Sequence, residues 1–315
     1  MSTKVSVVIP TMLRSTLSAA VESVERQTVD RSNIEIIVVA DVGPDSIIPE
    51  GIADRCDRII LTGGGKGGGG ARATGVRAAT HDLVAFLDDD DEWLPAKLEH
   101  QLHALGKGDP LTIVSCQVIQ HGASLAERVV PVDVIAQGQN IQDYLFRRRS
   151  ASIGRASMFT STLLASRELL LRTEWNSSLR RHQDWDWLVR VGRVPGVQFV
   201  QLQKPLVRYW TGSANSISAS ANWRDSLNWY LSVAEDWHPQ TAVDFLFAQT
   251  LRYSLQSRSF SGVRSVLSAA LSLRRMPSWS CVIVGASGVF GRAQLQRAMH
   301  ATGRAYVSNG ERANP

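Results

Sequence analysis

Five consecutive acidic side chains, Asp88 to Glu92, form the first group in the sequence that could do chemistry. They follow the apolar segment 83–87 (LVAFL), which is typical of a strand buried on both faces. Ligands of open α/β sheets bind at the carboxyl ends of the strands, where these carboxylates would converge. A Mg²⁺ or Mn²⁺ ion would relieve their repulsion, binding one or two carboxylates and the phosphates of a substrate. Helix capping explains one or two aspartates but not four.

A second acidic pair occurs in the segment 182–187 (HQDWDW). Asp184 and Asp186 are two positions apart, so on a helix only one of them can point into a given site. A carboxylate beside tryptophan can act as a general base, because partial desolvation sets its pKa. The alternative is an ordinary capped helix start, with Trp185 and Trp187 packed in the core.

The segment 62–75 (TGGGKGGGGARATG) is rich in glycine but matches no nucleotide-binding motif closely. Lys66 is followed by glycine, so the segment lacks the ending of a P-loop. It follows the third predicted strand rather than the first, which argues against a dinucleotide-binding fold. We expect a flexible lid that leads into a helix, with Arg72 near the helix start and suited to a phosphate or a base carbonyl. The alternative for Arg72 is a plain surface arginine.

The elements that would position these groups alternate along the first 120 residues. Continuous apolar runs predict buried strands, and a period of 3.6 residues predicts helices. The predicted strands are 5–9, 34–40, 57–61, 83–87 and 111–119, and the predicted helices are 16–27, 71–80, 92–105 and one that starts within 180–192. This alternation favours an α/β fold with a doubly wound, mostly parallel sheet. From residue 220 onward the sequence is typical of a helical appendage, and residues 304–315 are typical of a loose tail.

Composition is that of a globular protein, and the charge is unevenly spread. The chain has 315 residues, of which 44% are hydrophobic and 20% charged, with a net charge of +5. Residues 1–105 carry 10 basic and 16 acidic side chains, residues 106–219 carry 14 and 8, and residues 220–315 carry 10 and 5. Residues 245–310 hold eight arginines and no acidic residue. This basic region indicates contact with an anionic membrane surface, a homo-oligomer interface, or an ordinary helical bundle with a solvated arginine face.

Several protein classes are excluded by what the sequence lacks. The three cysteines, Cys56, Cys116 and Cys281, are far apart, which excludes a disulfide scaffold and a cysteine-based zinc site. No stretch of about 18 apolar residues occurs, so we expect no membrane span. We therefore expect a cytoplasmic protein that contacts the inner face of the membrane peripherally. We expect no nucleic-acid partner, because the basic region contains no recognisable nucleic-acid module.

Three segments, in this order, resemble glycosyltransferase family 2, the inverting nucleotide-sugar transferases of GT-A fold. Residues 5–14 (VSVVIPTMLR) resemble the opening strand and turn of the family. Residues 70–93 (GARATGVRAATHDLVAFLDDDDEW) resemble its helix, strand and DXD motif, and residues 182–190 (HQDWDWLVR) resemble its acceptor-side acidic motif. The resemblance covers roughly residues 4–215 and implies the GT-A type of α/β fold.

The resemblance also implies site residues. The nucleotide-sugar-binding positions would be Pro10, Thr11, Arg14, Asp41, Arg72, Asp88 and Asp89. Asp90 would bind the Mn²⁺ or Mg²⁺ ion, and Asp184 would be the catalytic base. Acceptor contacts would come from Trp185, Trp187 and Asp186, with a tryptophan stacked on a sugar ring or packed into the core.

The sequence departs from the family pattern at some of these positions. Met12 stands where an aromatic residue often stacks on the base, and Gln183 stands where a glutamate often precedes the catalytic base. Residues 208–218 hold no histidine where the family often has a metal-binding one. Water or a diphosphate oxygen would then fill that coordination position.

These observations predict a metal-dependent, inverting glycosyltransferase. It would use a nucleoside-diphosphate sugar, with UDP favoured, and a saccharide or lipid-linked acceptor in polysaccharide, cell-wall or glycoconjugate assembly. Residues 1–105 would bind the donor, residues 106–219 the acceptor, and residues 220–315 would form the basic helical region that meets a membrane surface or another copy. Two alternatives stay open: a non-catalytic nucleotide-binding scaffold of the same fold, and a sugar nucleotidyltransferase, which would release pyrophosphate.

Overall fold

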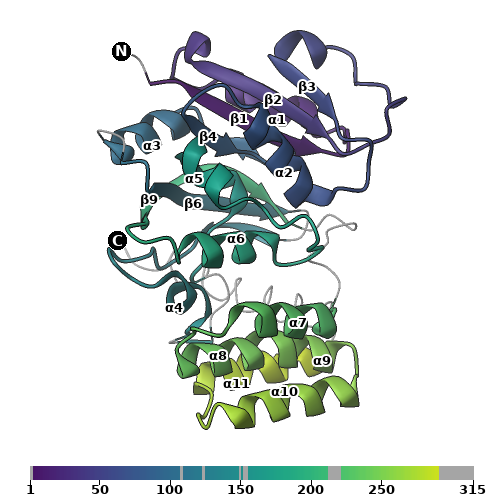
Figure 1. The fold of residues 1–315 in the computed structure, drawn as a ribbon, viewed down its shortest axis with the longest axis vertical. Helices are drawn as coiled ribbons and strands as arrows, with labels where there is room; N and C mark the ends of the chain where they lie inside the picture. The colour runs from purple at the N-terminus through teal and green to yellow at the C-terminus, as the bar shows by residue number, and fades with distance from the viewer. Residues whose placement is uncertain are drawn as a thin grey trace, which may run out of the picture. The chain divides into compact units, whose positions relative to one another are not determined.

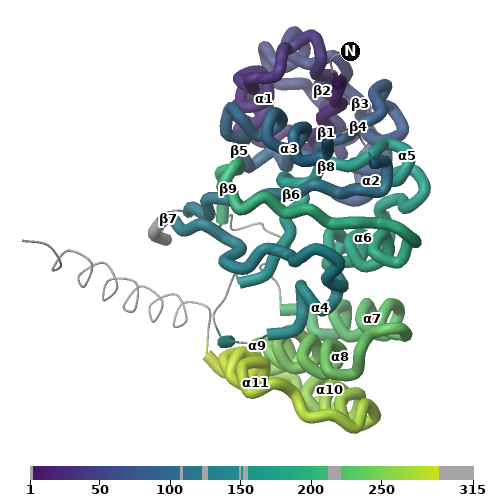
Figure 2. Tube along the Cα trace, turned by 90° about the vertical axis from the view of Figure 1, so that its left-hand side faces the viewer, coloured from purple at the N-terminus to yellow at the C-terminus, as the bar shows by residue number. Residues whose placement is uncertain are grey.

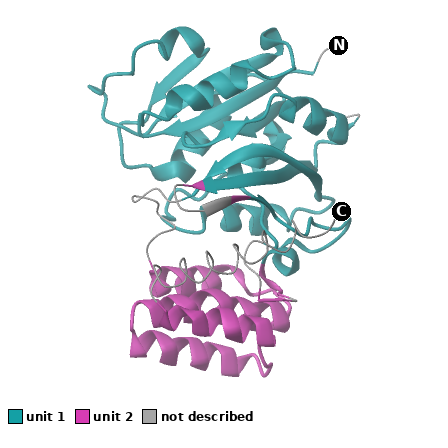
Figure 3. Ribbon diagram, turned by 180° about the vertical axis from the view of Figure 1, so that it is seen from behind, with its two compact units in different colours: residues 1–121, 128–145, 154–211 teal, residues 122–127, 146–153, 212–315 magenta. Residues whose placement is uncertain are grey.

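The computed structural model describes residues 3–106, 109–122, 125–148, 150–151, 155–211 and 221–290. The chain divides into two compact units (Figure 3). Unit 1 comprises residues 1–121, 128–145 and 154–211, and unit 2 comprises residues 122–127, 146–153 and 212–315. Unit 1 holds nearly all of the sheet and every candidate site residue, and unit 2 holds the helical region with Gly122 and residues 125–127 of the sheet.

Four parallel strands form the first half of the sheet in unit 1 (Figure 1). They are β1 (Val5–Thr11), β2 (Ile34–Ala40), β3 (Arg58–Leu61) and β4 (Leu83–Phe86). All residues of β1 and β2 are buried, as expected for strands covered on both faces. The register pairs Val5 with Ile34 and with Leu83, so the carboxyl ends of β1, β2 and β4 lie at one edge.

The helices of this half are α1 (Leu17–Glu25), α2 (Gly67–Ala78) and α3 (Lys97–Leu105). The predicted helix 92–105 is wrong over its first five residues. Glu92 and Trp93 form the short strand β5, which pairs antiparallel with a late strand of the sheet, and this pairing delays the helix. Helix α2 in contrast begins at Gly67, four residues earlier than predicted, so it includes four glycines in its first turn.

The second half of the sheet is mixed. Its strands are β6 (Thr112–Gly122), β7 (Leu125–Val130), β8 (Leu164–Ser166) and β9 (Gln198–Trp210). Strand β8 is antiparallel to both β4 and β6, whereas β6 and β9 are parallel. The order is β3-β2-β1-β4-β8-β6-β9-β5, with β7 beside β6 (Figure 2). Three helices accompany this half: α4 (Ile141–Phe146), α5 (Arg167–Arg172) and α6 (Gln183–Val191).

The core of unit 1 contains one fully buried amine. Lys97 lies at the start of α3, and its Nζ is 3.6 Å from the centre of the Trp93 ring. The same Nζ donates a hydrogen bond of 2.7 Å to Gln101 Oε1. Burial lowers the pKa of Lys97 to about 7, because the loss of water disfavours the charged form.

Unit 2 is helical, as predicted, over its described residues 221–290. Helices α8 (Pro239–Phe245) and α9 (Arg252–Gln256) are joined by the π-helical segment η5 (Leu246–Leu251), and the others are α7 (Trp223–Val233), α10 (Phe260–Ser272) and α11 (Trp279–Ala286). An aromatic cluster fills its interior: Phe146, Trp229, Tyr230, Trp237 and Phe245. The predicted tail 304–315 lies outside the described residues. No helix in the described part of the chain is long and apolar enough to cross a membrane.

Candidate functional site at the carboxyl ends of the strands

The acidic run follows β4, and its members have different partners. Asp89 is buried and accepts hydrogen bonds from Thr11 Oγ1 at 2.6 Å and Arg14 Nη1 at 3.1 Å. Asp90 accepts from the same Arg14 nitrogen at 3.0 Å. Asp91 is buried, and it accepts from Ser161 Oγ and from the Trp210 backbone N–H at 2.9 Å. One guanidinium therefore supplies the positive charge nearest to two of these carboxylates.

The acidic run lacks enough positive charge to neutralise it. Burial, followed by repulsion from Asp88, raises the pKa of Asp89, Asp90 and Asp91. The side chains of Asp88 and Asp90 are the accessible ones, at 29% and 26% exposure, whereas Asp89 and Asp91 are enclosed. Among the described residues, no three His, Cys, Asp or Glu side chains are close enough to hold a metal. The arrangement fits a divalent cation that takes one or two carboxylates and completes its shell with substrate oxygens.

The turn after β1 brings Thr11 and Arg14 to this acidic run. Pro10 and Thr11 end the strand, buried beside Val39 and Ala40 of β2. The Leu13 backbone N–H donates to Thr11 Oγ1 at 2.8 Å, and Leu13 has a φ of 58°. A left-handed leucine costs free energy and persists only where the surroundings hold it. This conformation leaves Met12 56% exposed at the tip of the turn.

Asp41 follows β2 and holds the start of the glycine-rich segment. Its carboxylate accepts hydrogen bonds from Thr62 Oγ1, from the Lys66 N–H at 3.0 Å and from the Gly67 N–H at 2.7 Å. Burial opposes ionisation, but these donors outweigh it and lower the pKa of Asp41. The aspartate thus caps α2 with a charge that suits a helix N-terminus.

The four helical glycines allow α2 to approach the acceptor-side motif. A Cβ built at Gly68 would lie 3.2 Å from both Arg72 Nη1 and Gln183 Oε1, which is tighter than most real contacts. At Gly75 it would lie 2.3 Å from a methyl of Val8, so α2 rests directly on β1 there. Close packing therefore requires glycine at Gly75, whereas a Cβ at Gly68 would displace the ends of Arg72 and Gln183 slightly.

Arg72 joins the two acidic motifs. This side chain is buried, and it pairs with Asp88 through Nη2 and with Gln183 Oε1 through Nη1 at 3.4 Å. Its guanidinium also lies 5.2 Å from the centre of the Trp175 ring. The surface-arginine alternative is wrong because the side chain is buried under Trp175. Two segments far apart in the sequence, after β4 and at the start of α6, thus meet through one side chain.

Asp184 lies in the first turn of α6. His182, the residue before α6, has a φ of 61°, and its ring stacks on Trp185 with centroids 4.6 Å apart. Burial is the main cause that raises the pKa of Asp184, and Arg72 partly offsets it. Burial also lowers the pKa of His182 to about 3, so the imidazole stays neutral. A partly buried carboxylate with a raised pKa, beside an arginine that contacts Asp88, has the properties of a general base.

The last two residues of this motif, Asp186 and Trp187, are buried and make contacts within the protein. Trp187 is fully buried, donates from its indole nitrogen to the Thr173 carbonyl at 2.7 Å, and stacks on Trp175 at 5.2 Å. Asp186 is buried and accepts from Arg190 Nε at 2.7 Å. Trp187 therefore has the core-packing role expected of one of the two tryptophans, and neither side chain is exposed to an acceptor. Trp185 is only partly buried.

Two aromatic groups near Asp90 were not identified from the sequence. His121, near the end of β6, lies opposite Trp210 of β9, and their rings meet edge to face at 4.9 Å. They line a pocket of about 230 Å³ with Thr16, Ala19, Asp90, Asp91 and Glu92. No sequence motif surrounds His121, so its position near Asp90 follows only from the pairing of β6 with β9.

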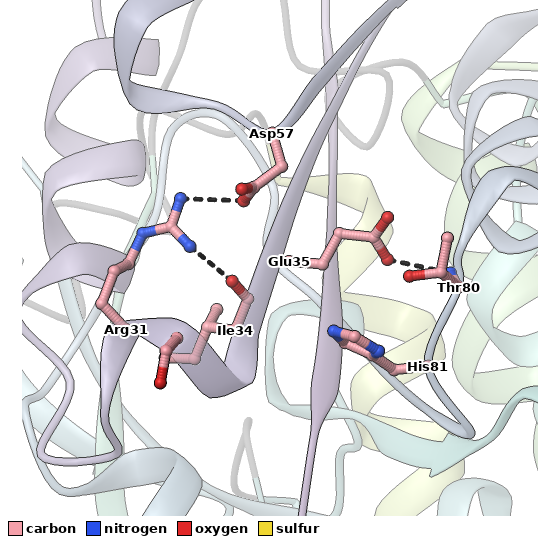
Figure 4. A pocket seen from close by; sticks show the side chains of 7 residues that line it. Arg31, Ile34, Glu35, Asp57, Thr80 and His81 are labelled. Atoms are coloured by element: carbon pink, nitrogen blue, oxygen red, sulfur yellow. Dashed lines mark hydrogen bonds and ion pairs between the residues drawn. The ribbon is translucent and has the colours of Figure 1, made fainter.

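A second polar cluster lies at the opposite, amino-terminal edge of the same strands (Figure 4). It borders a pocket of about 280 Å³ lined by Arg31, Ser32, Ile34, Glu35, Asp57, Thr80 and His81. Glu35 is buried and accepts from Ser6 Oγ at 2.5 Å and from the Thr80 N–H at 2.9 Å. Asp57 accepts from Arg31 Nη2 and from the Ile36 N–H, both at 2.8 Å. Burial opposes ionisation of Glu35, but its hydrogen bonds lower the pKa overall.

Known proteins resemble this chain over most of its length. The sequence model of the family described as glycosyl transferase family 2 matches residues 6–169. The amylovoran biosynthesis glycosyltransferase AmsB of Erwinia amylovora is 30% identical over 262 residues, which cover 77% of this chain and 80% of AmsB. The UDP-Glc:alpha-D-GlcNAc-diphosphoundecaprenol beta-1,3-glucosyltransferase WfgD of Escherichia coli is 32% identical over 108 residues, which cover 33% of this chain and 42% of WfgD.

Solved structures share the fold. S. aureus TarS 1–349 in complex with UDP-GlcNAc superposes with a TM-score of 0.57 at 13% identity, covering 90% of this chain and 91% of TarS 1–349. The mannosyltransferase PcManGT from Pyrobaculum calidifontis, in complex with GDP-Man and Mn²⁺, gives a TM-score of 0.50 at 17% identity, covering 97% of this chain and 81% of that one. These likenesses confirm the predicted α/β fold of GT-A type with a helical C-terminal region.

Proposed function

The chain belongs to glycosyl transferase family 2 and is a glycosyltransferase, and from this premise we propose that it transfers a sugar from a nucleoside-diphosphate sugar to an acceptor hydroxyl with inversion at the anomeric carbon. The observation that carries the proposal is the arginine link, in which Arg72 contacts both Asp88 of the acidic run and Gln183 beside Asp184. This link would bring the proposed diphosphate site next to the proposed base.

The donor would lie along the carboxyl ends of β1, β2 and β4, within residues 1–105. Pro10, Thr11 and Arg14 border this edge, Asp41 fixes the glycine-rich segment beside it, and Arg72 is suited to the diphosphate. Asp88, which is accessible, would face the ribose and the sugar, whereas the enclosed Asp89 would hold Thr11 and Arg14 at this edge. The TarS complex with UDP-GlcNAc and the PcManGT complex with GDP-Man support a nucleotide-sugar donor, and we favour a UDP-sugar.

A divalent cation would be held by Asp90, together with Asp88 or the donor itself. When bound, Mn²⁺ or Mg²⁺ supplies positive charge that stabilises the negative charge developing on the leaving diphosphate. Arg14 and Arg72 contribute fixed positive charge at the same edge. The PcManGT structure, which contains Mn²⁺, supports a metal in this fold.

The acceptor would enter from residues 106–219. As the acceptor oxygen bonds to the anomeric carbon and the bond from that carbon to the diphosphate breaks, Asp184 would take the hydroxyl proton. Its raised pKa makes it a stronger base than an ordinary aspartate. Trp185, which is partly buried next to Asp184, would contact the acceptor sugar.

The names of the relatives support a role in polysaccharide assembly. AmsB is named for amylovoran biosynthesis, and WfgD for transfer to a diphosphoundecaprenol-linked sugar. We infer a saccharide acceptor carried on a lipid diphosphate, used at the inner face of the membrane.

A thermal-shift panel tests the donor site. Wild type, Asp90→Asn and the exposed control Asp54→Asn would be melted with UDP, dTDP, GDP or CDP, each with and without Mn²⁺. A ligand at 100 times its Kd adds about 2.7 kcal/mol, which raises the Tm by several degrees. We expect one nucleotide to act only with Mn²⁺, on wild type and Asp54→Asn but not on Asp90→Asn. A shift that Asp90→Asn retains would contradict the metal assignment.

Product analysis separates the enzyme classes. A glycosyltransferase releases a nucleoside diphosphate only when an acceptor is present, whereas a nucleotidyltransferase releases pyrophosphate. Nucleotide binding without turnover on any lipid-linked acceptor would favour the scaffold alternative.

A further inference from the structure

Large apolar side chains are exposed mainly on the last helices of unit 2. Nine of the fifteen exposed large apolar side chains in the described part of the chain lie between residues 260 and 290. We call them the apolar face: Phe260, Leu267, Leu271, Met276, Trp279, Val282, Ile283, Val289 and Phe290. Scattered exposed apolar residues are ordinary, but such a concentration indicates an interaction surface.

Helical spacing gathers these side chains into stripes. Phe260, Leu267 and Leu271 are separated by seven and four positions and so share one side of α10, with Arg264 between them. On α11, Trp279, Val282 and Ile283 are separated by three and one positions and likewise share a side. Figure 1 shows α10 and α11 as the last two labelled helices, in yellow-green.

The opposite sides of both helices are already occupied by the core. Val266 and Ala270 of α10 are buried, as are Cys281 and Val284 of α11. A Cβ at Gly285 would lie only 2.6 Å from the Phe247 carbonyl oxygen, so α11 rests directly on the η5 backbone. Because this contact fixes the rotation of α11, its outer stripe cannot turn into the core without unpacking the unit.

The segment that carries the apolar face has charged side chains of one sign. Residues 245–290 contain five arginines and no aspartate or glutamate. Arg264, Arg274 and Arg275 are exposed among the apolar side chains. Two copies joined through this face would bring arginines together with no acidic partner from the same segment, which disfavours self-association. An anionic surface with an apolar interior complements both the charge and the apolar side chains.

We propose that the apolar face of α10 and α11 docks on the surface of an anionic lipid bilayer. Leu271, Trp279 and Ile283 insert at the boundary between headgroups and acyl chains, where tryptophan is favoured. The arginines meet lipid phosphates, with their apolar stems along the bilayer surface. This inference rests on the proposed function for its purpose, since a lipid-linked acceptor is presented at such a surface.

Vesicle binding by the full chain tests the proposal. Co-sedimentation would compare vesicles of phosphatidylglycerol and phosphatidylcholine with vesicles of phosphatidylcholine alone, at low and high salt. The variants are Leu271→Ser/Trp279→Ser/Ile283→Ser and, as a control, Ile47→Ser, which removes a side chain 89% exposed in unit 1. We expect wild type and the control to bind anionic vesicles, more weakly at high salt, and the triple variant to bind at least tenfold more weakly. Unchanged melting of the triple variant would show that it is folded.

Three results would overturn the proposal. One is no binding of wild type to anionic vesicles, and another is equal binding by the triple variant. The third is a dimer in solution that the triple variant dissociates, which would assign the face to a second copy. Transfer to a water-soluble acceptor analogue is measured in parallel. Loss of vesicle binding with intact transfer means that docking alone fails, whereas vesicle binding without transfer means that the proposed function fails.

Discussion

The two edges of the parallel strands in unit 1 carry similar side chains that behave in opposite ways. At the amino edge, Glu35 is buried and its pKa is lowered, because Ser6 and Thr80 donate to its carboxylate. At the carboxyl edge, Asp89 and Asp90 have raised pKa values, because burial and neighbouring carboxylates outweigh Arg14. Both edges border a pocket of similar volume.

The difference shows how structural carboxylates can be distinguished from functional ones. A carboxylate whose donors are complete stabilises the fold and has nothing to offer a ligand. A buried carboxylate with few hydrogen-bond donors and little positive charge nearby destabilises the fold, and binding of a cation or a proton stabilises it. Position alone does not determine whether a carboxylate is structural or functional. Asp41 lies at the carboxyl edge, but backbone N–H groups at the start of α2 donate hydrogen bonds to its carboxylate.

The largest expected effect is on turnover. Asp184→Asn keeps the shape of the side chain but removes the base, so kcat should fall by about 10²- to 10⁴-fold with nucleotide affinity unchanged. Product formation and nucleotide titration measure the two quantities. The control is Asp186→Asn, whose parent side chain pairs with Arg190 and should affect the Tm more than kcat. A kcat of Asp184→Asn within a few-fold of wild type would remove Asp184 from the mechanism.

The next effect is the loss of cation-dependent binding in acid. The ion needs an ionised carboxylate, so binding should weaken as the pH falls through the raised pKa of Asp90, above the ordinary 3.8. The Mn²⁺-dependent Tm shift by the preferred nucleotide should therefore disappear in mild acid. A shift that persists to pH 3.8 would mean that Asp90 does not bind the ion.

At the amino edge we expect a smaller effect, on stability alone. Glu35→Gln removes the charge from two hydrogen bonds and should cost about 1–2 kcal/mol at pH 7, with nucleotide affinity unchanged. A lowered pKa means that this stabilisation is present above the unfolded value of 4.5 and is lost as the pH falls through the folded value. The Tm difference from wild type should therefore shrink below pH 4.5. A weaker nucleotide affinity in Glu35→Gln would contradict the contrast between the edges.

The smallest effect is expected for an exposed ion pair at the same edge. The side chains of Arg31 and Asp57 are 39% and 44% exposed, so solvent screens their attraction. Arg31→Ala should change stability by only about 0–1 kcal/mol in urea denaturation, with little dependence on added salt. A loss well beyond that range would mean that the amino-edge cluster acts as one network.

The first half of the fold is predictable because its strands are buried on both faces. The run 34–40 predicts a strand with the same ends as β2, since continuous β-branched residues leave no other favourable arrangement. Strand β9 was not predicted, because its exposed and buried positions are irregular and its partners β6 and β5 are distant in sequence. The start of α2 was also missed. Four glycines have poor helix propensity, and only the folded structure explains them. Gly67 has a φ of 68°, Gly68 and Gly69 approach Gln183, and a Cβ at Gly70 would lie 2.7 Å from Lys66 Cβ.

The candidate site is predictable as separate motifs but not as an arrangement. The acidic run and the segment around Asp184 are evident from residue types. The bridge that Arg72 makes between them depends on the tertiary fold, as does the His121–Trp210 pair beside Asp90. The satisfied state of Asp41 also depends on backbone N–H groups, which no residue type reveals.

The buried amine of Lys97 can report, through chemical labelling, how often the core of unit 1 opens. With a pKa of about 7, about half of this amine is neutral and nucleophilic at pH 7. An acylating reagent nevertheless reaches it only when α3 leaves the sheet. The chain has only five lysines, so mass spectrometry can follow this one apart from the rest. The rate at which Lys97 acquires label would then measure how often the sheet opens, and a bound donor should slow it.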